Sequence, residues 1–445
     1  MFQCTALIRP FFKLSWCDCR LCAAVLIAFQ LHALAQNDSA APNTFSLADA
    51  ERTAFARNWD LLAAQTGVDS ATAQWLVAKE FPNPTFSYST AEIGSYENRT
   101  PVGNGLWSRS YDTIFAINQL IEIGGKRRDR KTSAQAGVIG AQARFYDARR
   151  LLDQGVTKAY VAALLAGENA RVLAESARLL RHETDIAQAR LKAGDIADAD
   201  EKQIENSADV FELQARSAAA TAVQARIAVE ILLGSEQPKG AWTPADTLAQ
   251  MAFIAPQIDS SKTTTLRPDV LAAQADLNQS KSDLKLQKAM RVPDPTFSFL
   301  VEHNPPGGGP PADTVGIGVS FPLPLWNLNG GEIKSAQATV AKNALALAKA
   351  KAQAAADVAN AQAEFREASE RLARYQNQIL PRSQKVREAV AFAYEKGGAT
   401  LVDLLEAERA DNDARLATAQ ALSDTASAVA DLKAATEGMD QKPRQ

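Results

Sequence analysis

The chain has 445 residues and carries 48 Lys and Arg against 51 Asp and Glu, a formal net charge of -3. This balance excludes a protein that binds nucleic acid through a global positive field, and the 46% apolar share excludes general disorder. Only 7% of the residues are aromatic, and long stretches rich in Ala, Gln and charged residues indicate much helix with thin packing layers.

The first 35 residues have the pattern of a secretory signal peptide. Arg9, Lys13 and Arg20 form a basic region, Leu21–Phe29 forms an apolar run, and Ala33-Leu34-Ala35 offers small residues for cleavage before position 36. A short membrane anchor is the alternative, but the apolar run is too short to span a bilayer comfortably. Cleavage would also remove all four cysteines, which are Cys4, Cys17, Cys19 and Cys22.

Residues 36–240 predict a first structural repeat. It contains a helix, a strand hairpin over 82–123 and a long helical hairpin over 126–234 with its tip at Gly194. No proline occurs between Lys126 and Lys192, a length that corresponds to about 100 Å of helix at about 1.5 Å per residue. Such a helix is much longer than the average helix of a globular domain.

Residues 241–445 predict a second repeat of the same kind. It contains a linker, a helix over 266–290, a strand hairpin over 295–322 and a helical hairpin over 331–438, broken by Pro381, with its tip at 397. The segment Phe81–Tyr88 resembles Val292–Phe299, which follows 211 residues later. A period of about 200 residues indicates a duplicated domain rather than a short solenoid repeat.

The predicted strands alternate between apolar side chains and small or polar ones. The alternating positions are Thr113, Phe115, Ile117, Gln119, Ile121 and Ile123 in the first repeat, and Phe297, Phe299, Val301, Val315, Ile317, Val319 and Phe321 in the second. This pattern favours a transmembrane barrel with a wet lumen, although the edge of a soluble sandwich also fits it. Four strands cannot close such a barrel, because the smallest have about eight, so several chains must share one.

A basic run, Lys126 to Lys131, opens the first long helix. We interpret it as a solvated first helical turn below the barrel, with attraction to anionic lipid as the alternative. Nucleic acid is excluded as a partner for an exported chain. Glycines mark both hairpin tips, and Gly194, Gly397 and Gly398 permit the positive φ that a tight turn between helices requires.

The layout of residues 45 to 438 resembles the TolC-type outer membrane efflux proteins. Tyr394, Gly397, Asp403 and Glu406 match the family's periplasmic entrance at relative positions 0, 3, 9 and 12. The first tip repeats the glycine-to-aspartate spacing with Gly194 and Asp200, but Gln203 replaces the second acid and Ala399 replaces a gate arginine found in some members. The turns Ile123–Arg128 and Phe321–Trp326, the latter followed by Gly330-Gly331-Glu332, look like the heavy-metal subgroup, the CzcC and CusC types.

The resemblance implies a mainly α fold with a transmembrane β-barrel contribution. Three chains would share a 12-stranded barrel on a long α-helical tunnel, in the Gram-negative outer membrane and the periplasm. The partners would be two further copies, outer membrane lipid, a periplasmic adaptor and an inner-membrane RND pump. The implied function is a passive conduit for heavy-metal cations or drugs. An exported coiled-coil scaffold or adaptor, and the channel of a type I protein secretion system, remain alternatives.

The resemblance also assigns roles to the tip residues. Asp403 and Glu406 lie three apart on one helix face, so a threefold axis would gather them, with Asp200 nearby, into a ring that favours cations and whose self-repulsion proton or metal binding could relieve. The alternative is a solvated helix N-terminus that favours acids. The glycine tips with Tyr394 would form the surface that docks the adaptor, and the exposed neighbours would touch it: Lys192, Ala193, Ala399 and Leu401.

The sequence offers few ligands for a metal or a cofactor. Only His182 and His303 remain after cleavage, with no cysteine, so we expect no dedicated metal site and no cofactor. Nucleophile-elbow, phosphate-loop and zinc-protease motifs are absent from the sequence, so we expect no enzyme.

Overall fold

The structure is a computed structural model that describes residues 44–91, 112–253, 266–303 and 313–438. The chain divides into two units, Met1–Thr44 and Phe45–Gln445, and the helices and the four-stranded sheet described below belong to the second. The predicted signal peptide over 1–35 lies outside the described residues. The same is true of the loop inside each strand hairpin, residues 92–111 and 304–312.

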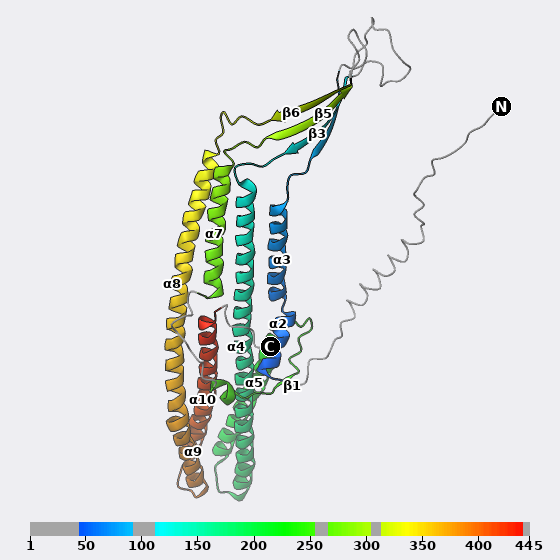
Figure 1. The fold of residues 1–445 in the computed structure, drawn as a ribbon. Coiled ribbons are helices and arrows are strands. Elements are labelled where there is room, and N and C mark those ends of the chain that lie inside the picture. The colour runs from blue at the N-terminus through cyan, green and yellow to red at the C-terminus, as the bar shows by residue number, and fades with distance from the viewer. Residues whose placement is uncertain (1–43, 92–111, 254–265, 304–312, 439–445) are drawn as a thin grey trace, which may run out of the picture. The chain divides into compact units, whose positions relative to one another are not determined.

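Helices make up most of the described chain (Figure 1). The predicted first repeat, residues 36–240, contains α2 (Leu47–Arg57), α3 (Trp59–Lys79), α4 (Lys126–Ala193) and α5 (Asp198–Leu232). The predicted second repeat, residues 241–445, contains α6 (Leu248–Ala252), α7 (Pro268–Ala289), α8 (Gly330–Arg374), α9 (Leu380–Glu395) and α10 (Leu401–Thr436). None of the described helices is long and apolar enough to cross a membrane.

The long helix of the second repeat changes its winding just before Pro381. A π-helical turn over Tyr375–Ile379 separates α8 from α9. Proline lacks an amide hydrogen and its ring clashes with the preceding turn, so a locally wider turn accommodates it without ending the helix. The sequence therefore located this break within a few residues.

Each long helix packs against shorter helices that follow one another along its length. The helix α4 contacts α3, α5, α7 and α10, and α8 contacts α7 and α10 (Figure 1). On α8 the buried residues recur every seven positions, at Leu347, Ala354, Ala361 and Ala368. A heptad stripe of mostly alanine gives a narrow seam between close helices, which suits a thin layer.

The largest apolar cluster surrounds the middle of α4. Tyr160 is fully buried, stacks on Trp242 at 5.8 Å between ring centroids, and donates a hydrogen bond to the carbonyl of Phe45 at 2.8 Å. Phe45 belongs to β1 (Thr44–Phe45), which pairs with β4 (Thr243–Pro244). This cluster fixes the linker between the repeats against the first long helix.

Four antiparallel strands form the second sheet, in the order β2-β3-β5-β6. Their bounds are Thr85–Ala91, Asp112–Leu120, Thr296–His303 and Asp313–Ser320. The predicted fold class, mainly α with four strands per chain, is confirmed. The sequence did not predict β1, β4 and α6, nor the division of the first helix into α2 and α3 at Asn58, whose side chain caps α3 through the amide of Leu61 at 3.0 Å.

Candidate functional site: the amphipathic sheet and the helical tips

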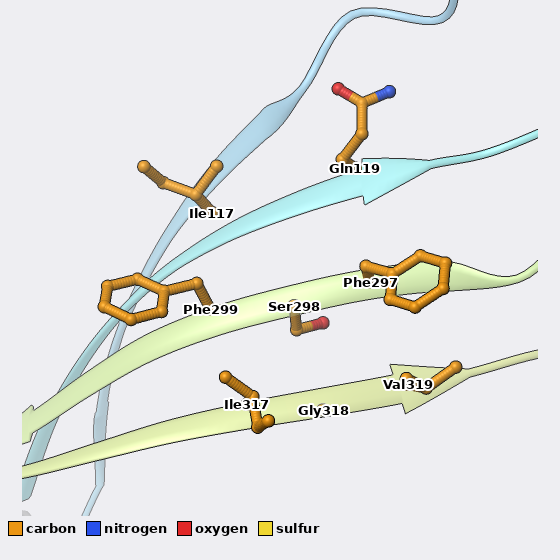
Figure 2. Close-up of a pocket in the computed structure, with 8 residues that line it drawn as sticks. All are labelled: Ile117, Gln119, Phe297, Ser298, Phe299, Ile317, Gly318 and Val319. Carbon is orange, nitrogen blue, oxygen red and sulfur yellow. The ribbon is translucent and has the colours of Figure 1, made fainter.

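One face of the four-stranded sheet is apolar from edge to edge. Phe86, Ile117, Phe299 and Ile317 lie opposite one another across the four strands. All four are exposed, and Ile317 keeps 89% of its surface. Figure 2 shows this shallow apolar surface with the neighbouring Phe297, Val319 and Gln119. Large exposed apolar side chains in register indicate a face that is covered by an apolar medium in the working protein.

The opposite face of the sheet is small and polar. The adjacent row is Thr85, Asn118, Ser298 and Gly318. Ser298 donates a hydrogen bond to the Asn118 side chain at 2.7 Å, and Asn118 donates in turn to Ser87 at 3.3 Å. A wet lumen suits these hydroxyl and amide groups, whereas a lipid-facing position would not.

Below the sheet, the basic run of α4 fastens strands to helices. The side chain of Lys126 is only 4% exposed, and its Nζ lies 2.7 Å from Asp294 and donates to the carbonyl of Val292. Asp294 also accepts a hydrogen bond from the amide of Ile123 at 2.9 Å. The interpretation of this run as a solvated helical turn was therefore wrong at Lys126, which is a buried joint between the two repeats.

Two arginines of the same run have similar roles. Arg130 forms a bidentate pair with Glu122 at 2.5 and 2.9 Å. Arg127 donates to the carbonyl of Lys79 at the end of α3, and its guanidinium lies 3.8 Å from the centroid of the Phe81 ring. The basic side chains of this joint were visible in the sequence, but the partners of Lys126 and Arg127 come from distant segments.

Glycine forms both helical tips. Gly194 has φ 81° and Gly397 has φ 78°, the left-handed conformation that glycine adopts without strain. The amide of Asp195 bonds the carbonyl of Arg190 at 2.9 Å, and the amide of Gly398 bonds that of Ala393 at 2.8 Å. These bonds close both helix ends. Gly398 itself does not adopt positive φ, so that requirement holds for one glycine of the pair.

Tyr394 joins the two tips. Its ring packs against an apolar cluster that includes Phe211 of α5 and Leu401 of α10, and the Arg190 guanidinium lies 5.7 Å from its centroid. Burial raises the pKa of Tyr394, and Asp200 and Glu183 add to that rise while Arg190 opposes it. The charge of Asp200 thus acts on Tyr394. Leu401 is only 8% exposed, so the expectation that it is a free docking residue was wrong.

Asp403 is a helix-capping residue as well as an exposed acid. Its carboxylate accepts hydrogen bonds from the amide and the hydroxyl of Thr400 at 2.9 and 2.7 Å, and its own amide donates to that hydroxyl at 3.2 Å. This capping box lowers the pKa of Asp403, chiefly through the Thr400 hydroxyl. Glu406 is exposed one turn further on. Asp403 is therefore held in its ionised form.

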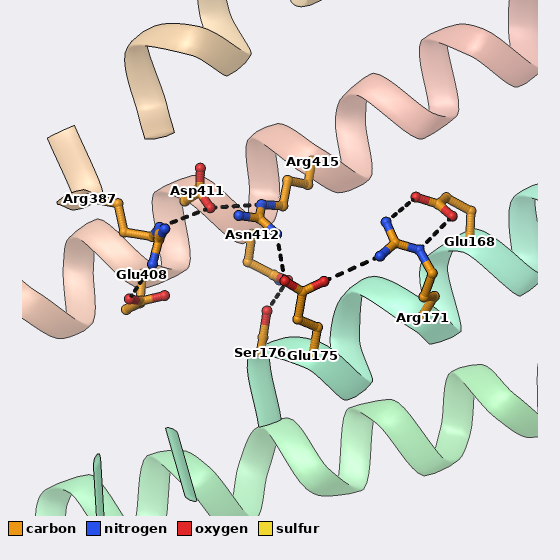
Figure 3. Close-up of polar contacts among 9 residues, drawn as sticks. All are labelled: Glu168, Arg171, Glu175, Ser176, Arg387, Glu408, Asp411, Asn412 and Arg415. Carbon is orange, nitrogen blue, oxygen red and sulfur yellow. Dashed lines mark hydrogen bonds and ion pairs between the residues drawn. The ribbon is translucent and has the colours of Figure 1, made fainter. Parts of the chain in front are cut away.

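A partly buried network of ion pairs joins α4, α9 and α10 farther from the tip, and the sequence analysis did not predict it (Figure 3). We call this network the ionic relay. Asp411 of α10 has a 4% exposed side chain, 2.8 Å from Arg415 Nε and 3.4 Å from Arg387 Nε of α9. Arg415 also lies 3.4 Å from Glu175 of α4, and Arg387 lies 3.4 Å from Glu408. The pair of Arg415 with Glu175 connects the two helical hairpins, and the pairs of Arg387 join α9 to α10. The available signal was the periodicity, since Asp411 falls on the buried apolar stripe of α10.

Within the described residues, no group of three or more His, Cys, Asp or Glu side chains is placed to hold a metal ion. His303 lies 2.6 Å from Asp313 across the β5–β6 pair.

Comparison with known proteins identifies the family. The family described as "Outer membrane efflux protein" matches residues 52–235 and 260–438. The chain belongs to this family. This chain is 25% identical over 366 residues to the cobalt-zinc-cadmium resistance protein CzcC of Cupriavidus metallidurans. The matched residues cover 81% of this chain and 82% of that protein. The recognition drawn from the tip motifs is therefore confirmed.

Solved structures of similar fold agree with the architecture. The outer-membrane channel OprN superimposes with a TM-score of 0.75 at 19% identity, over 88% of the efflux chain and 90% of OprN. CusC superimposes with a TM-score of 0.74 at 16% identity, over 91% and 96% of the two chains. The predicted function, an outer membrane efflux channel, is confirmed with the family.

Proposed function

We propose that three copies of this chain form one outer membrane conduit in a tripartite efflux system, without catalysis. The four strands of each copy would contribute to a 12-stranded barrel, and the long helices to a tunnel. A periplasmic adaptor and an inner-membrane RND pump would complete the system. The conduit would be passive, since the pump supplies the energy.

The amphipathic sheet carries this proposal. Its four strands form too small a sheet to close, and both β2 and β6 are edges. Within lipid every backbone group needs a partner, so an open sheet with an apolar face requires further strands from other copies. Three copies would provide the twelve strands that close the ring.

Membrane location and native mass test the shared barrel. The full chain is expressed in a Gram-negative host, the membranes are separated by density, and the detergent-extracted particle is sized by light scattering. We expect an outer membrane particle of three chains. A soluble periplasmic species would overturn the proposal and favour an exported coiled-coil scaffold.

We propose heavy-metal cations as the leading cargo and drugs as the second. The similarity to a cobalt-zinc-cadmium resistance protein supports this order. The test is a host that lacks its own channel and expresses this chain with a metal-exporting pump and its adaptor. Restored tolerance to cobalt, zinc or cadmium would support metal export, while restored tolerance to dyes alone, or export of a protein substrate alone, would overturn it.

We propose that Asp403 and Glu406 form a cation-favouring ring at the tunnel entrance, with Asp200 at its edge. The capping box lowers the pKa of Asp403 within one chain, which supports a negative charge at this position. Bilayer conductance of Asp403→Asn with Glu406→Gln, compared with wild type, tests the ring. Unchanged cation selectivity would overturn it.

We propose the tips as the adaptor's docking surface. Lys192 and Ala193 are exposed beside Gly194, as are Gly397 and Gly398 in the second tip. Ala193→Asp is the test variant, and Ala338→Asp on the exposed face of α8 is its control. Loss of efflux with Ala193→Asp, at unchanged channel abundance, would support docking, and unchanged efflux would contradict it.

We propose, finally, that the chain is organised as a cleaved signal peptide over 1–35 and two repeats over 36–240 and 241–445. N-terminal sequencing of the membrane-bound protein tests the first boundary. A mature protein that starts at position 36 is expected.

A further inference from the structure

The apolar face of the sheet is too short by itself to cross the hydrocarbon layer of a membrane. On β5 the apolar row runs from Phe297 to Val301 and on β6 from Val315 to Val319, about 14 Å along each strand at about 3.4 Å per residue. Strands of outer membrane barrels are tilted by about 40°, so these rows supply about 10 Å of height, whereas the apolar band of such barrels is about 25 Å tall. Further apolar surface must therefore adjoin the sheet at one of its ends.

The end of the face next to the hairpin loops is polar. Thr113, His303 and Asp313 lie opposite one another in the last described row of this face. His303 Nδ1 lies 2.6 Å from Asp313 Oδ1. Among the described residues the apolar face therefore ends at this row, and the missing height has to come from the opposite end, where the strands meet the helices.

The segment between β6 and α8 carries five exposed apolar side chains at that opposite end (Figure 1). Trp326 keeps 93% of its surface, the largest fraction among the exposed large apolar residues of the described chain. The other four are 55–67% exposed, and they are Phe321, Leu323, Leu325 and Leu328. A contiguous run of this kind indicates a surface that an apolar medium covers in the working protein.

We infer that residues 321–328 lie at the periplasmic boundary of the outer membrane, in contact with phospholipid acyl chains, and that Arg291 lies at the level of the lipid phosphates. We call residues 321–328 the boundary segment. The inference rests on the shared barrel of the proposed function and adds a lipid-binding element outside the strands.

The boundary segment adjoins the sheet on its apolar side. Ile317 and Val319 both belong to the apolar face, and Phe321 comes two positions after Val319, directly beyond the end of β6. The segment is thus continuous with the surface that the barrel presents to lipid. A position in the wet lumen would instead leave Trp326 and three leucines against water.

The backbone of the boundary segment also suits an apolar medium. Pro322 and Pro324 have no amide hydrogen that would need a partner. The amide of Leu325 donates to the carbonyl of Leu323 at 2.9 Å. Because unpaired backbone groups are costly in lipid, these features favour an irregular segment at the edge of the hydrocarbon layer.

Basic side chains mark the level of the lipid head groups. Arg291 is exposed, and its Nε donates to the carbonyl of Leu328 at 3.0 Å, which places the guanidinium beside the boundary segment. The exposed acids near the sheet-side helix ends, within the described residues, are Glu80 and Glu332. Further exposed cations near these helix ends are Arg128, Lys285, Lys288 and Lys334. An excess of cations beside an apolar surface is complementary to the phosphates of a phospholipid leaflet.

Spin labels test the position of the boundary segment. The four native cysteines lie within residues 1–22 and are replaced by serine in the full chain, which is purified and reconstituted into vesicles of phosphatidylethanolamine and phosphatidylglycerol. A nitroxide is attached through Leu325→Cys in the boundary segment, Ile317→Cys on the apolar sheet face, or Lys342→Cys on α8. Leu323→Cys repeats the test if Leu325→Cys fails to assemble. Collision rates are measured with oxygen, which concentrates in lipid, and with a nickel complex, which stays in water.

We expect the ratio of oxygen to nickel collisions to be severalfold higher at Leu325 than at Lys342, and highest at Ile317. Lys342 is the matched control, because it is an exposed, charged position about 18 Å from the start of α8. A position at the edge of the hydrocarbon layer gives an intermediate ratio, since water reaches it more often than it reaches the sheet face.

A label at Arg291→Cys tests the level of the head groups. It should broaden the phosphorus resonance of the vesicle lipid, and the label at Lys342 should broaden it far less, because paramagnetic broadening falls steeply with distance. Equal or absent broadening would overturn the assignment of Arg291 to the lipid phosphates.

The outcomes separate this inference from the proposed function. Frequent oxygen collisions at Ile317 together with water-like collisions at Leu325 would overturn the inference and leave the barrel standing. A label at Leu325 that is shielded from both reagents would also overturn it, because protein rather than lipid would then cover the segment. Water-like collisions at all three positions would overturn the shared barrel as well.

Discussion

Removal of the Asp411 carboxylate should loosen the contact between α9 and α10 within the second helical hairpin. Asp411 Oδ2 lies 2.8 Å from Arg415 Nε and 3.4 Å from Arg387 Nε, and the side chain is 4% exposed. At an effective dielectric constant of about 20, each attraction is about 5–6 kcal/mol before desolvation is subtracted. Loss of one member of a buried ion pair costs about 3–5 kcal/mol, because the remaining charge stays buried.

The lower end of that range applies here. After Asp411→Ala, Arg415 keeps Glu175 and Arg387 keeps Glu408, each at 3.4 Å. We therefore expect the free energy of local opening to fall by about 3 kcal/mol. That value corresponds to an increase of about 150-fold in the population of the open form.

Amide hydrogen exchange of the purified full-length protein measures this opening directly. The exchange rates should rise in α9 and in the first half of α10, and stay unchanged in the sheet. Glu168→Ala is the control, since Glu168 forms an exposed pair with Arg171 at 2.7 Å and such pairs contribute about 0–1 kcal/mol. Exchange in α9 that Asp411→Ala leaves unchanged, or that Glu168→Ala raises as much, would refute the role of Asp411 in joining α9 to α10.

Three further predictions concern the joint, a buried acid and the apolar face. Lys126→Ala should lower the unfolding temperature by leaving Asp294 unpaired, at a cost of about 3 kcal/mol, and Lys126→Arg should lower it less. Burial first, and then Asp153, raise the pKa of Glu51 to about 7, so the folded state binds this proton more tightly than the unfolded state and loses stability as the pH rises from about 4.5 to 7. The loss should be about 1–2 kcal/mol after allowance for solvent screening. Thermal unfolding between pH 5 and 8 should show it in the wild type and not in Glu51→Gln. Ile317→Arg should lower the amount of folded protein in the outer membrane, because an arginine on the lipid-facing side costs about 2–4 kcal/mol of stability near the bilayer midplane. Gly318→Arg on the polar face should lower that amount less.

The groups around Glu51 explain why its expected pH dependence is a property of the folded state. Asp153 of α4 and Glu437 beside α10 disfavour its charge, while Lys433 of α10 favours it and lies 2.6 Å from Asp153. Three carboxylates thus share one ammonium group. A pH dependence that persists in Glu51→Gln would assign the titration to Glu437 instead.

Local pattern was sufficient for most of the architecture. Period-two alternation identified the strands, and Gly194 located the end of α4 to within one residue of its observed end at Ala193. Glycine spacing located both tips. These features depend on neighbours a few residues apart, where sequence and geometry are tightly coupled.

Pairing between distant segments could not be predicted in the same way. Lys126 and Asp294 are 168 positions apart, and a lysine at a helix start is solvated in most proteins. Asp403 was recognised by its spacing from Gly397, but its capping role depends on Thr400, whose position three residues before an acid is itself a capping signal. That signal was available and unused, whereas the burial of Lys126 required the tertiary structure.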